Sequence, residues 1–196
     1  MALADRAVYA TQPVQLEHQL DGLLAGAAPK PIEGEIVALV VPDSNRLAGG
    51  AVAAEAYGLL RGRDYENVIL VSPSHHGPFE RLSICRIDRY RTPLGDVPVN
   101  DRLRNELCDE DDDIFIDDQG HYHTEGADVQ LPFLQKVLGG PDEPGFSVVP
   151  IVMGSEQPAF CRELGHAIGE VMYGKRVLVI ASADLLSVEG HALDEF

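Results

Sequence analysis

Lysine, paired cysteines and long apolar runs are all scarce or missing in this chain of 196 residues. No apolar run approaches the ~18 residues that a membrane-spanning helix needs, which excludes an integral membrane protein. The segment Met1-Ala2-Leu3-Ala4-Asp5-Arg6 lacks the basic flank and apolar stretch of a signal peptide. The sequence therefore predicts a cytoplasmic protein.

Cysteine is limited to Cys85, Cys108 and Cys161, which are widely spaced and form no C-x-x-C pair. Reduced cysteines are the expectation for a cytoplasmic chain, each acting as a small buried apolar residue. Lysine occurs only at positions 30, 136 and 175, whereas arginine occurs 12 times. Such a composition is typical of proteins from salt-adapted or GC-rich bacteria and archaea.

The charge balance is strongly negative, with 32 acidic residues, 15 basic residues and a formal net charge of −17. A field of that sign repels phosphate backbones, so a nucleic-acid partner is excluded. Hydrophobic residues make up 45% of the chain and charged residues 24%, as in ordinary globular proteins. This length predicts one domain over residues 1–196.

Short apolar runs alternate with helical patterns along the chain. Residues 36–41 are six consecutive apolar residues, which is typical of a strand buried on both faces of a parallel sheet. Alternation of this kind predicts an α/β fold with a mostly parallel sheet sandwiched by helices. The predicted strands are 36–41, 68–71, 82–87, 146–152 and 177–180; the predicted helices are 13–24, 47–60, 101–108, 131–138 and one that Ser155 caps and that runs through Met172.

Polar side chains follow three of the buried strands. Asp43 comes after the first, His75 after the second and Asp184 after the last. Because parallel strands end at one edge of a sheet, these residues are expected to share a site. No P-loop, G-x-G-x-x-G or G-x-S-x-G motif follows a strand, which disfavours a nucleotide-binding protein and an α/β-hydrolase.

Two segments, Thr92-Pro93-Leu94-Gly95 and Val129-Gln130-Leu131-Pro132-Phe133-Leu134, occur together with Ser72-Pro73-Ser74-His75. In these segments the chain resembles Memo-like proteins, whose prokaryotic members are called protein B of the AmmeMemoRadiSam system. The resemblance implies the fold of class III extradiol dioxygenases and covers almost the whole chain. The first two segments are the most specific matches, and further matches are residues 149–154 and residues 180–185.

Only some of the residues that the resemblance implies as metal ligands are present. A histidine of the family pattern falls at Asp43, a second at Glu125 and a third at Ser187, whereas His75, Asp184 and an upstream histidine at His121 match. Family members also continue for roughly a third more, so the chain reads as one whose C-terminal part is missing. The resemblance gives six pocket candidates: Asp43, His75, His121, Glu125, Asp128 and Asp184.

Each candidate has a plainer role beside the functional one. Asp43 could cap the following helix, and Asp184 could bond the amides of its own turn. A set of His75, Asp43 and Asp184 would suit a divalent metal such as Fe, Mn or Mg. A 2-His-1-carboxylate site would need a second histidine, for which His121 is the nearby candidate.

Three functional hypotheses remain open at this point. The first is a non-catalytic accessory protein of an AmmeMemoRadiSam-type pathway, with radical-SAM and AMMECR-type proteins as partners. The second is a metal-dependent oxidoreductase of the extradiol type with altered ligands, and the third is a gene fragment without its own function. If the C-terminal part of the family fold is missing, apolar surface near residues 177–180 or 131–138 loses its cover. Exposed apolar surface favours association, so the sequence predicts a homo-oligomer.

Overall fold

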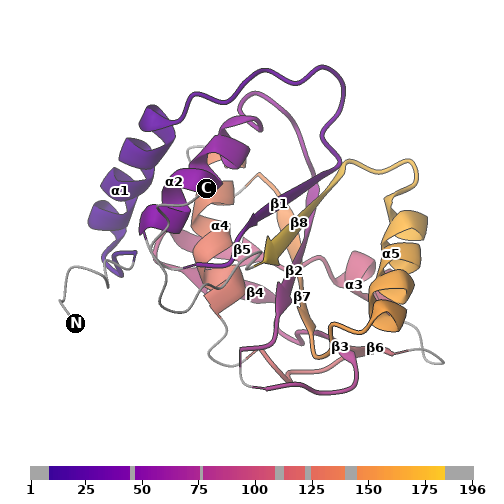
Figure 1. The fold of residues 1–196 in the computed structure, drawn as a ribbon. Helices are drawn as coiled ribbons and strands as arrows, with labels where there is room; N and C mark the ends of the chain where they lie inside the picture. The colour runs from indigo at the N-terminus through magenta and orange to yellow at the C-terminus, as the bar shows by residue number, and fades with distance from the viewer. Residues whose placement is uncertain are drawn as a thin grey trace, which may run out of the picture.

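A six-stranded sheet with helices on both faces forms the centre of the computed structural model (Figure 1). The structure describes residues 9–44, 47–75, 77–108, 113–121, 125–139 and 145–183. The helices are α1 (Pro13–Gly26), α2 (Leu47–Gly58), α3 (Asp101–Leu107), α4 (Glu125–Leu138) and α5 (Pro158–Met172). The strands are β1 (Ala38–Pro42), β2 (Asn67–Pro73), β3 (Leu82–Ile84), β4 (Arg89–Thr92), β5 (Gly95–Pro98), β6 (Ile114–Ile116), β7 (Ser147–Met153) and β8 (Val177–Ala183).

The sheet is mostly parallel, as the sequence predicts. Its strand order is β1-β8-β2-β7-β3-β6, and β3 and β7 form the antiparallel pair. The last of the described strands, β8, lies between the first two, with Val41 opposite Ser182 and Leu70 opposite Ile180. The carboxyl ends of β1, β8, β2 and β7 therefore meet at one edge.

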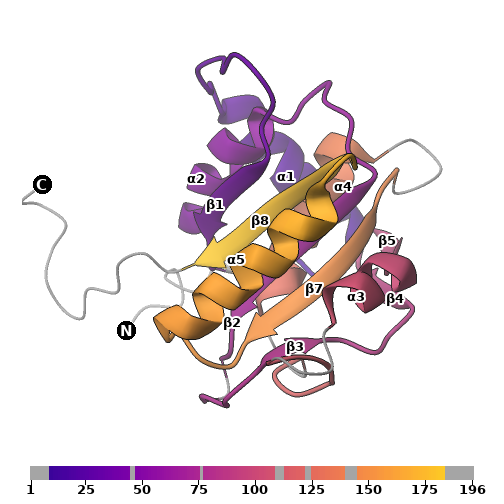
Figure 2. The same ribbon diagram turned by 90° about the vertical axis from the view of Figure 1, so that its right-hand side faces the viewer.

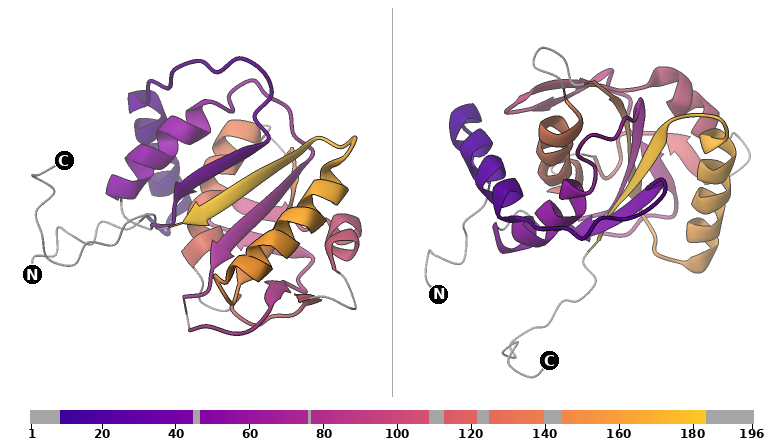
Figure 3. Two further views of the ribbon diagram at one scale, coloured as in Figure 1. Left: turned by 45° about the vertical axis from the view of Figure 1, so that its right-hand side comes forward. Right: turned by 90° about the horizontal axis from the view of Figure 1, so that it is seen from above.

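Helices cover both faces of this sheet (Figures 2 and 3). On one face, α1, α2 and α4 pack over a core that includes Leu20, Tyr57, Leu70, Phe133 and Ile180. On the other face, α3 and α5 cover side chains of β2, β7 and β8. This layering follows from strands that are apolar on both sides and cannot leave either face in water.

The predicted position of exposed apolar surface is wrong. Val177, Leu178 and Ile180 of β8 and Leu131 and Leu134 of α4 are all buried, because the sheet and its helices pack against each other. Exposed apolar side chains lie instead on and beside β1, which pairs with β8 alone among the described strands. Val37 is 56% exposed and Val40 is 59% exposed.

The burial of the three cysteines differs from the expectation that each is buried: Cys85 is buried, Cys108 is intermediate and Cys161 is exposed.

Two predicted helix starts differ from the structure. Helix α5 is preceded by Gln157 as its N-cap and has a proline in its first turn, whereas Ser155 lies outside and its hydroxyl accepts a bond from the Gln157 amide. Helix α4 begins at Glu125 and contains Pro132 in its interior. The sequence prediction began this helix at residue 131; in the structure the helix continues through Pro132, and burial of Val129 and Leu131 offsets the backbone bond that Pro132 removes.

Candidate functional site

Asp43 and His75 meet at the carboxyl edge of the sheet. His75 Nε2 lies 2.9 Å from Asp43 Oδ2, and the side chains are 28% and 1% exposed, respectively. The end of β1 fixes Asp43, whose backbone amide donates to the carbonyl of Ala183 at 3.1 Å. The predicted meeting of these two residues is therefore seen in the structure, with a buried carboxylate behind a partly exposed imidazole.

A hydrogen-bonded network of buried polar side chains continues behind Asp43. The Ser182 hydroxyl donates to Asp43 Oδ1 at 3.0 Å, and the Gln130 amide donates to Ser182 Oγ at 2.9 Å. The same Gln130 nitrogen also donates to the carbonyl of Pro42, and the Tyr57 hydroxyl donates to Gln130 Oε1 at 2.8 Å. This network of hydrogen bonds thus links β1 and β8 to α4 and α2.

These bonds explain how a carboxylate can be buried here. An ionised carboxylate in an apolar interior is costly unless its oxygens have polar partners. Ser182 hydrogen-bonds to Oδ1, and His75 Nε2 lies within ion-pair distance of Oδ2. His75 Nε2 faces the carboxylate, and Nδ1 is the ring nitrogen that does not contact Asp43. Burial raises the pKa of Tyr57 well above its usual value, which keeps its hydroxyl a donor to Gln130.

The other candidates do not gather around this pair in the described residues. His121 Nε2 lies 2.9 Å from the carbonyl of Ser83, and burial lowers the pKa of His121. Asp128 is exposed and accepts a 2.8 Å hydrogen bond from the Tyr90 hydroxyl, which connects α4 to β4. The Glu125 side chain and all of Asp184 lie outside the described residues, as does His76.

The fit to a metal can be tested on these atoms. Within the described part of the chain, no three His, Cys, Asp or Glu side chains are arranged to hold a metal ion. Asp43 Oδ2 and His75 Nε2 face each other and not a common point, so the pair offers fewer ligands than a facial triad needs. The described residues by themselves do not fit a catalytic metal.

Sequence reasoning missed Tyr57, Gln130 and Ser182 as members of the site. Ser182 lies two residues before Asp184, in the last predicted strand segment, and Gln130 lies in the Val-Gln-Leu-Pro-Phe-Leu segment. A glutamine and a serine within otherwise apolar stretches are the signal that could have found them, because such residues need buried partners. Tyr57, in a helix of small residues, carries no comparable signal.

This arrangement defines a class: an α/β protein whose mostly parallel sheet holds a polar site at its carboxyl edge. The family model described as Memo-like protein matches residues 2–192. A MEMO1 family protein from Sulfolobus acidocaldarius is 33% identical over 93% of this chain and 68% of its own length. Another from Pyrobaculum aerophilum is 32% identical over 90% of this chain and 61% of its own length.

The chain belongs to the Memo-like family, which confirms the resemblance. A further MEMO1 family protein, from Thermoplasma acidophilum, is 28% identical over 81% of this chain and 57% of its own length. The chain thus spans a little over half to two-thirds of the length of these curated relatives. No helix among the described residues is both long and apolar enough to cross a membrane.

Proposed function

We propose that this chain is an accessory, non-catalytic member of the Memo-like family that works in an AmmeMemoRadiSam-type pathway. The supporting observation is the Asp43–His75 pair, in which the carboxylate is buried, one oxygen accepts a hydrogen bond from Ser182 and the other lies 2.9 Å from His75 Nε2. A carboxylate held in this way orients an imidazole and fixes the ends of β1 and β8. A divalent metal would have to break these bonds to use Asp43 as a ligand.

Partners belong to the same proposal. Radical-SAM and AMMECR-type proteins are the partners expected for a member of such a pathway. We propose no nucleic-acid partner, because a chain of formal charge −17 repels a phosphate backbone. We further propose a homo-oligomer. The exposed valines of the edge strand β1 support self-association at that strand, in place of the surface first expected.

One observation favours the second candidate, a metal-dependent oxidoreductase of the extradiol type with altered ligands. His75 is partly exposed at the sheet edge, and its Nδ1 is not used by Asp43. With Asp184 or Glu125 as further ligands, that nitrogen could take part in an oxygen-rich site for Fe, Mn or Mg. The two candidates differ in whether the purified chain retains metal and turns over substrate.

An anaerobic loading experiment separates the two candidates. The purified chain is loaded with Fe(II), desalted, analysed for metal and assayed for ring cleavage of catechols, with His75→Ala prepared in parallel. We expect no turnover and far less than one retained ion per chain, equal in both proteins. Retention of one iron per chain that is lost in His75→Ala, together with catechol turnover, would replace the accessory role by the enzymatic one.

A further inference from the structure

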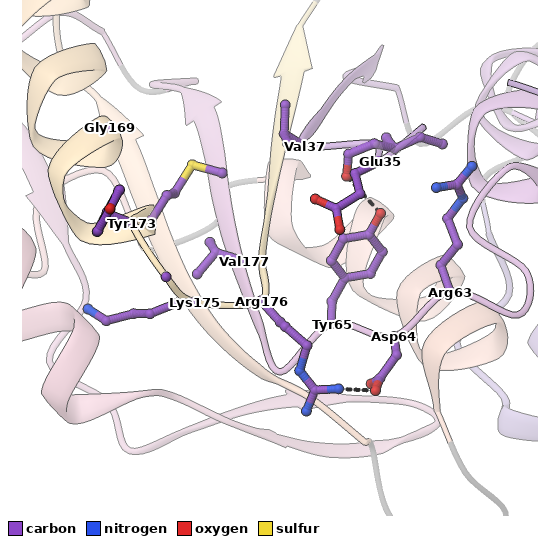
Figure 4. A pocket seen from close by; sticks show the side chains of 13 residues that line it. Glu35, Val37, Arg63, Asp64, Tyr65, Gly169, Tyr173, Lys175, Arg176 and Val177 are labelled. Atoms are coloured by element: carbon purple, nitrogen blue, oxygen red, sulfur yellow. Dashed lines mark hydrogen bonds and ion pairs between the residues drawn. The ribbon is translucent and has the colours of Figure 1, made fainter. Parts of the chain in front are cut away.

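A second polar region lies at the opposite edge of the sheet from His75. The segments that lead into β1, β2 and β8, together with the end of α5, line a pocket of about 650 Å³. A volume of this size is within the range of small-molecule sites. Figure 4 shows Glu35, Asp64 and Tyr65 along one side, with Tyr173 and Lys175 from the α5–β8 turn along the other.

The positive charges of this pocket already have partners. The Arg63 guanidinium donates to the carbonyls of Leu59, Gly34 and Ile32. Lys175 pairs with Glu106, and Arg176 pairs with both Asp64 and Glu66. An anionic ligand would have to displace these bonds on a chain of formal charge −17, so the pocket is poorly suited to one.

The Glu35 carboxylate is in the opposite situation. Within the described part of the chain it has no ion pair and no hydrogen bond, and Figure 4 shows it beside the Tyr65 ring at the pocket. Tyr65 is held in place because its hydroxyl donates to the carbonyl of Ile36 at 2.7 Å. Burial is the main cause of the raised pKa of Tyr65; Arg63 beside the ring lowers that pKa and Glu35 raises it, so both charged groups lie near the Tyr65 hydroxyl.

Apolar and aromatic side chains also line the pocket, alongside Arg63, Lys175 and Arg176. Ile36 and Val177 are buried at the base of the pocket, and Met172 lies on its α5 side. Tyr173 is 92% exposed, which is unusual for so large an aromatic side chain. A carboxylate attracts an organic cation through its charge, and an aromatic ring beside it attracts the same cation through the face of the ring.

We propose that this pocket binds a small amphipathic organic cation, a primary amine carried on an aromatic or aliphatic body. The ammonium group would pair with Glu35, and the body would lie between Tyr65 and Tyr173 over Ile36, Met172 and Val177. The site is separate from the Asp43–His75 pair. It does not depend on the accessory role proposed above.

The test uses 2-phenylethylamine as the probe, titrated into the full chain and followed by calorimetry and by amide chemical shifts. Phenylacetate has the same ring with the opposite charge, and ethylamine has the same charge without the ring. We expect 2-phenylethylamine to bind with a Kd in the millimolar range or below, and the two comparison compounds to bind at least about fivefold more weakly. Shift changes should centre on Ile36, Tyr65 and Tyr173.

Two variants and a matched control complete the experiment. Glu35→Gln should weaken binding about fivefold or more, and Tyr173→Ala should weaken it as well. Glu33→Gln removes an exposed carboxylate two residues away that does not line the pocket, and it should bind like the parent chain. Absence of 2-phenylethylamine binding, equal binding of phenylacetate, or equal affinity of Glu35→Gln and Glu33→Gln would each overturn the proposal.

Discussion

The imidazole of His121 is held in its neutral form by its surroundings. Burial lowers its pKa from the ordinary 6.5, although the carbonyl of Ser83 and the charges of Asp118 and Asp117 act against this shift. The unfolded chain therefore takes up a proton at a higher pH than the folded chain. The free energy of unfolding should fall as the pH drops through 6.5 and level off below the lowered pKa.

His121→Gln should remove this part of the pH dependence, while a smaller stability at neutral pH is expected from the changed contact with Ser83. The measurement is urea unfolding of both proteins between pH 5 and 8. His166→Gln, at an exposed position of α5, serves as the control. If the wild-type and His121→Gln curves run parallel over this pH range, the buried neutral imidazole is not the cause.

Single residues also show how far sequence reasoning reaches into the site. Asp43 and His75 could be predicted because each directly follows a buried strand, and parallel strands end at a shared edge. Gln130 could not be placed, since its partners depend on how α4 is rotated against two strands and α2. The strand ends determine the contact between Asp43 and His75, whereas tertiary packing determines the contacts of Gln130.

At the scale of elements, β1 is an edge strand that contains no charged residue. Residues 36–41 contain no charge, and Val40 is 59% exposed next to a free strand edge in the described sheet. Charged side chains or bulges normally block pairing at such edges. We expect a second copy to pair here, so that the wild-type chain self-associates as its concentration rises.

Val40→Lys should return the protein to a monomer, because a charge on an edge strand opposes pairing with another strand. Val52→Lys is the matched control: Val52 is 60% exposed on α2 and its change should leave association intact. Sedimentation velocity over a wide concentration range measures both. A wild-type chain that stays monomeric at all concentrations would contradict the expectation.

The elements that were predicted and those that were missed differ in length and apolar content. The long apolar runs of β2, β7 and β8 are clear in the sequence because both of their faces are buried. The hairpin of β4 and β5 was missed, since its strands contain Arg89, Arg91 and Asp96, and Pro93-Leu94 is not a common hairpin turn. Strand β6 has only three residues, too few for a periodic pattern.

For the whole molecule, the net charge of −17 is the dominant long-range feature. Like charges oppose the compact state, and salt screens them. The thermal midpoint should therefore rise by a few degrees between low salt and ~1 M KCl, since ~1 kcal/mol corresponds to about 2–4 °C for a chain of this size. The rise should shrink at pH 5, where fewer carboxylates are ionised; a flat or falling midpoint at pH 7 would contradict salt adaptation.

The position of β8 between β1 and β2 affects how the protein is made on the ribosome. β1 and β2 leave the ribosome early, but the strand that joins them is the last of the described strands to be synthesised. At about 5–20 residues per second, β1 waits on the order of ten seconds for its neighbour. During that interval its apolar surface is open to chaperones and to other nascent chains, so the rate of synthesis itself becomes a factor in the yield of folded protein.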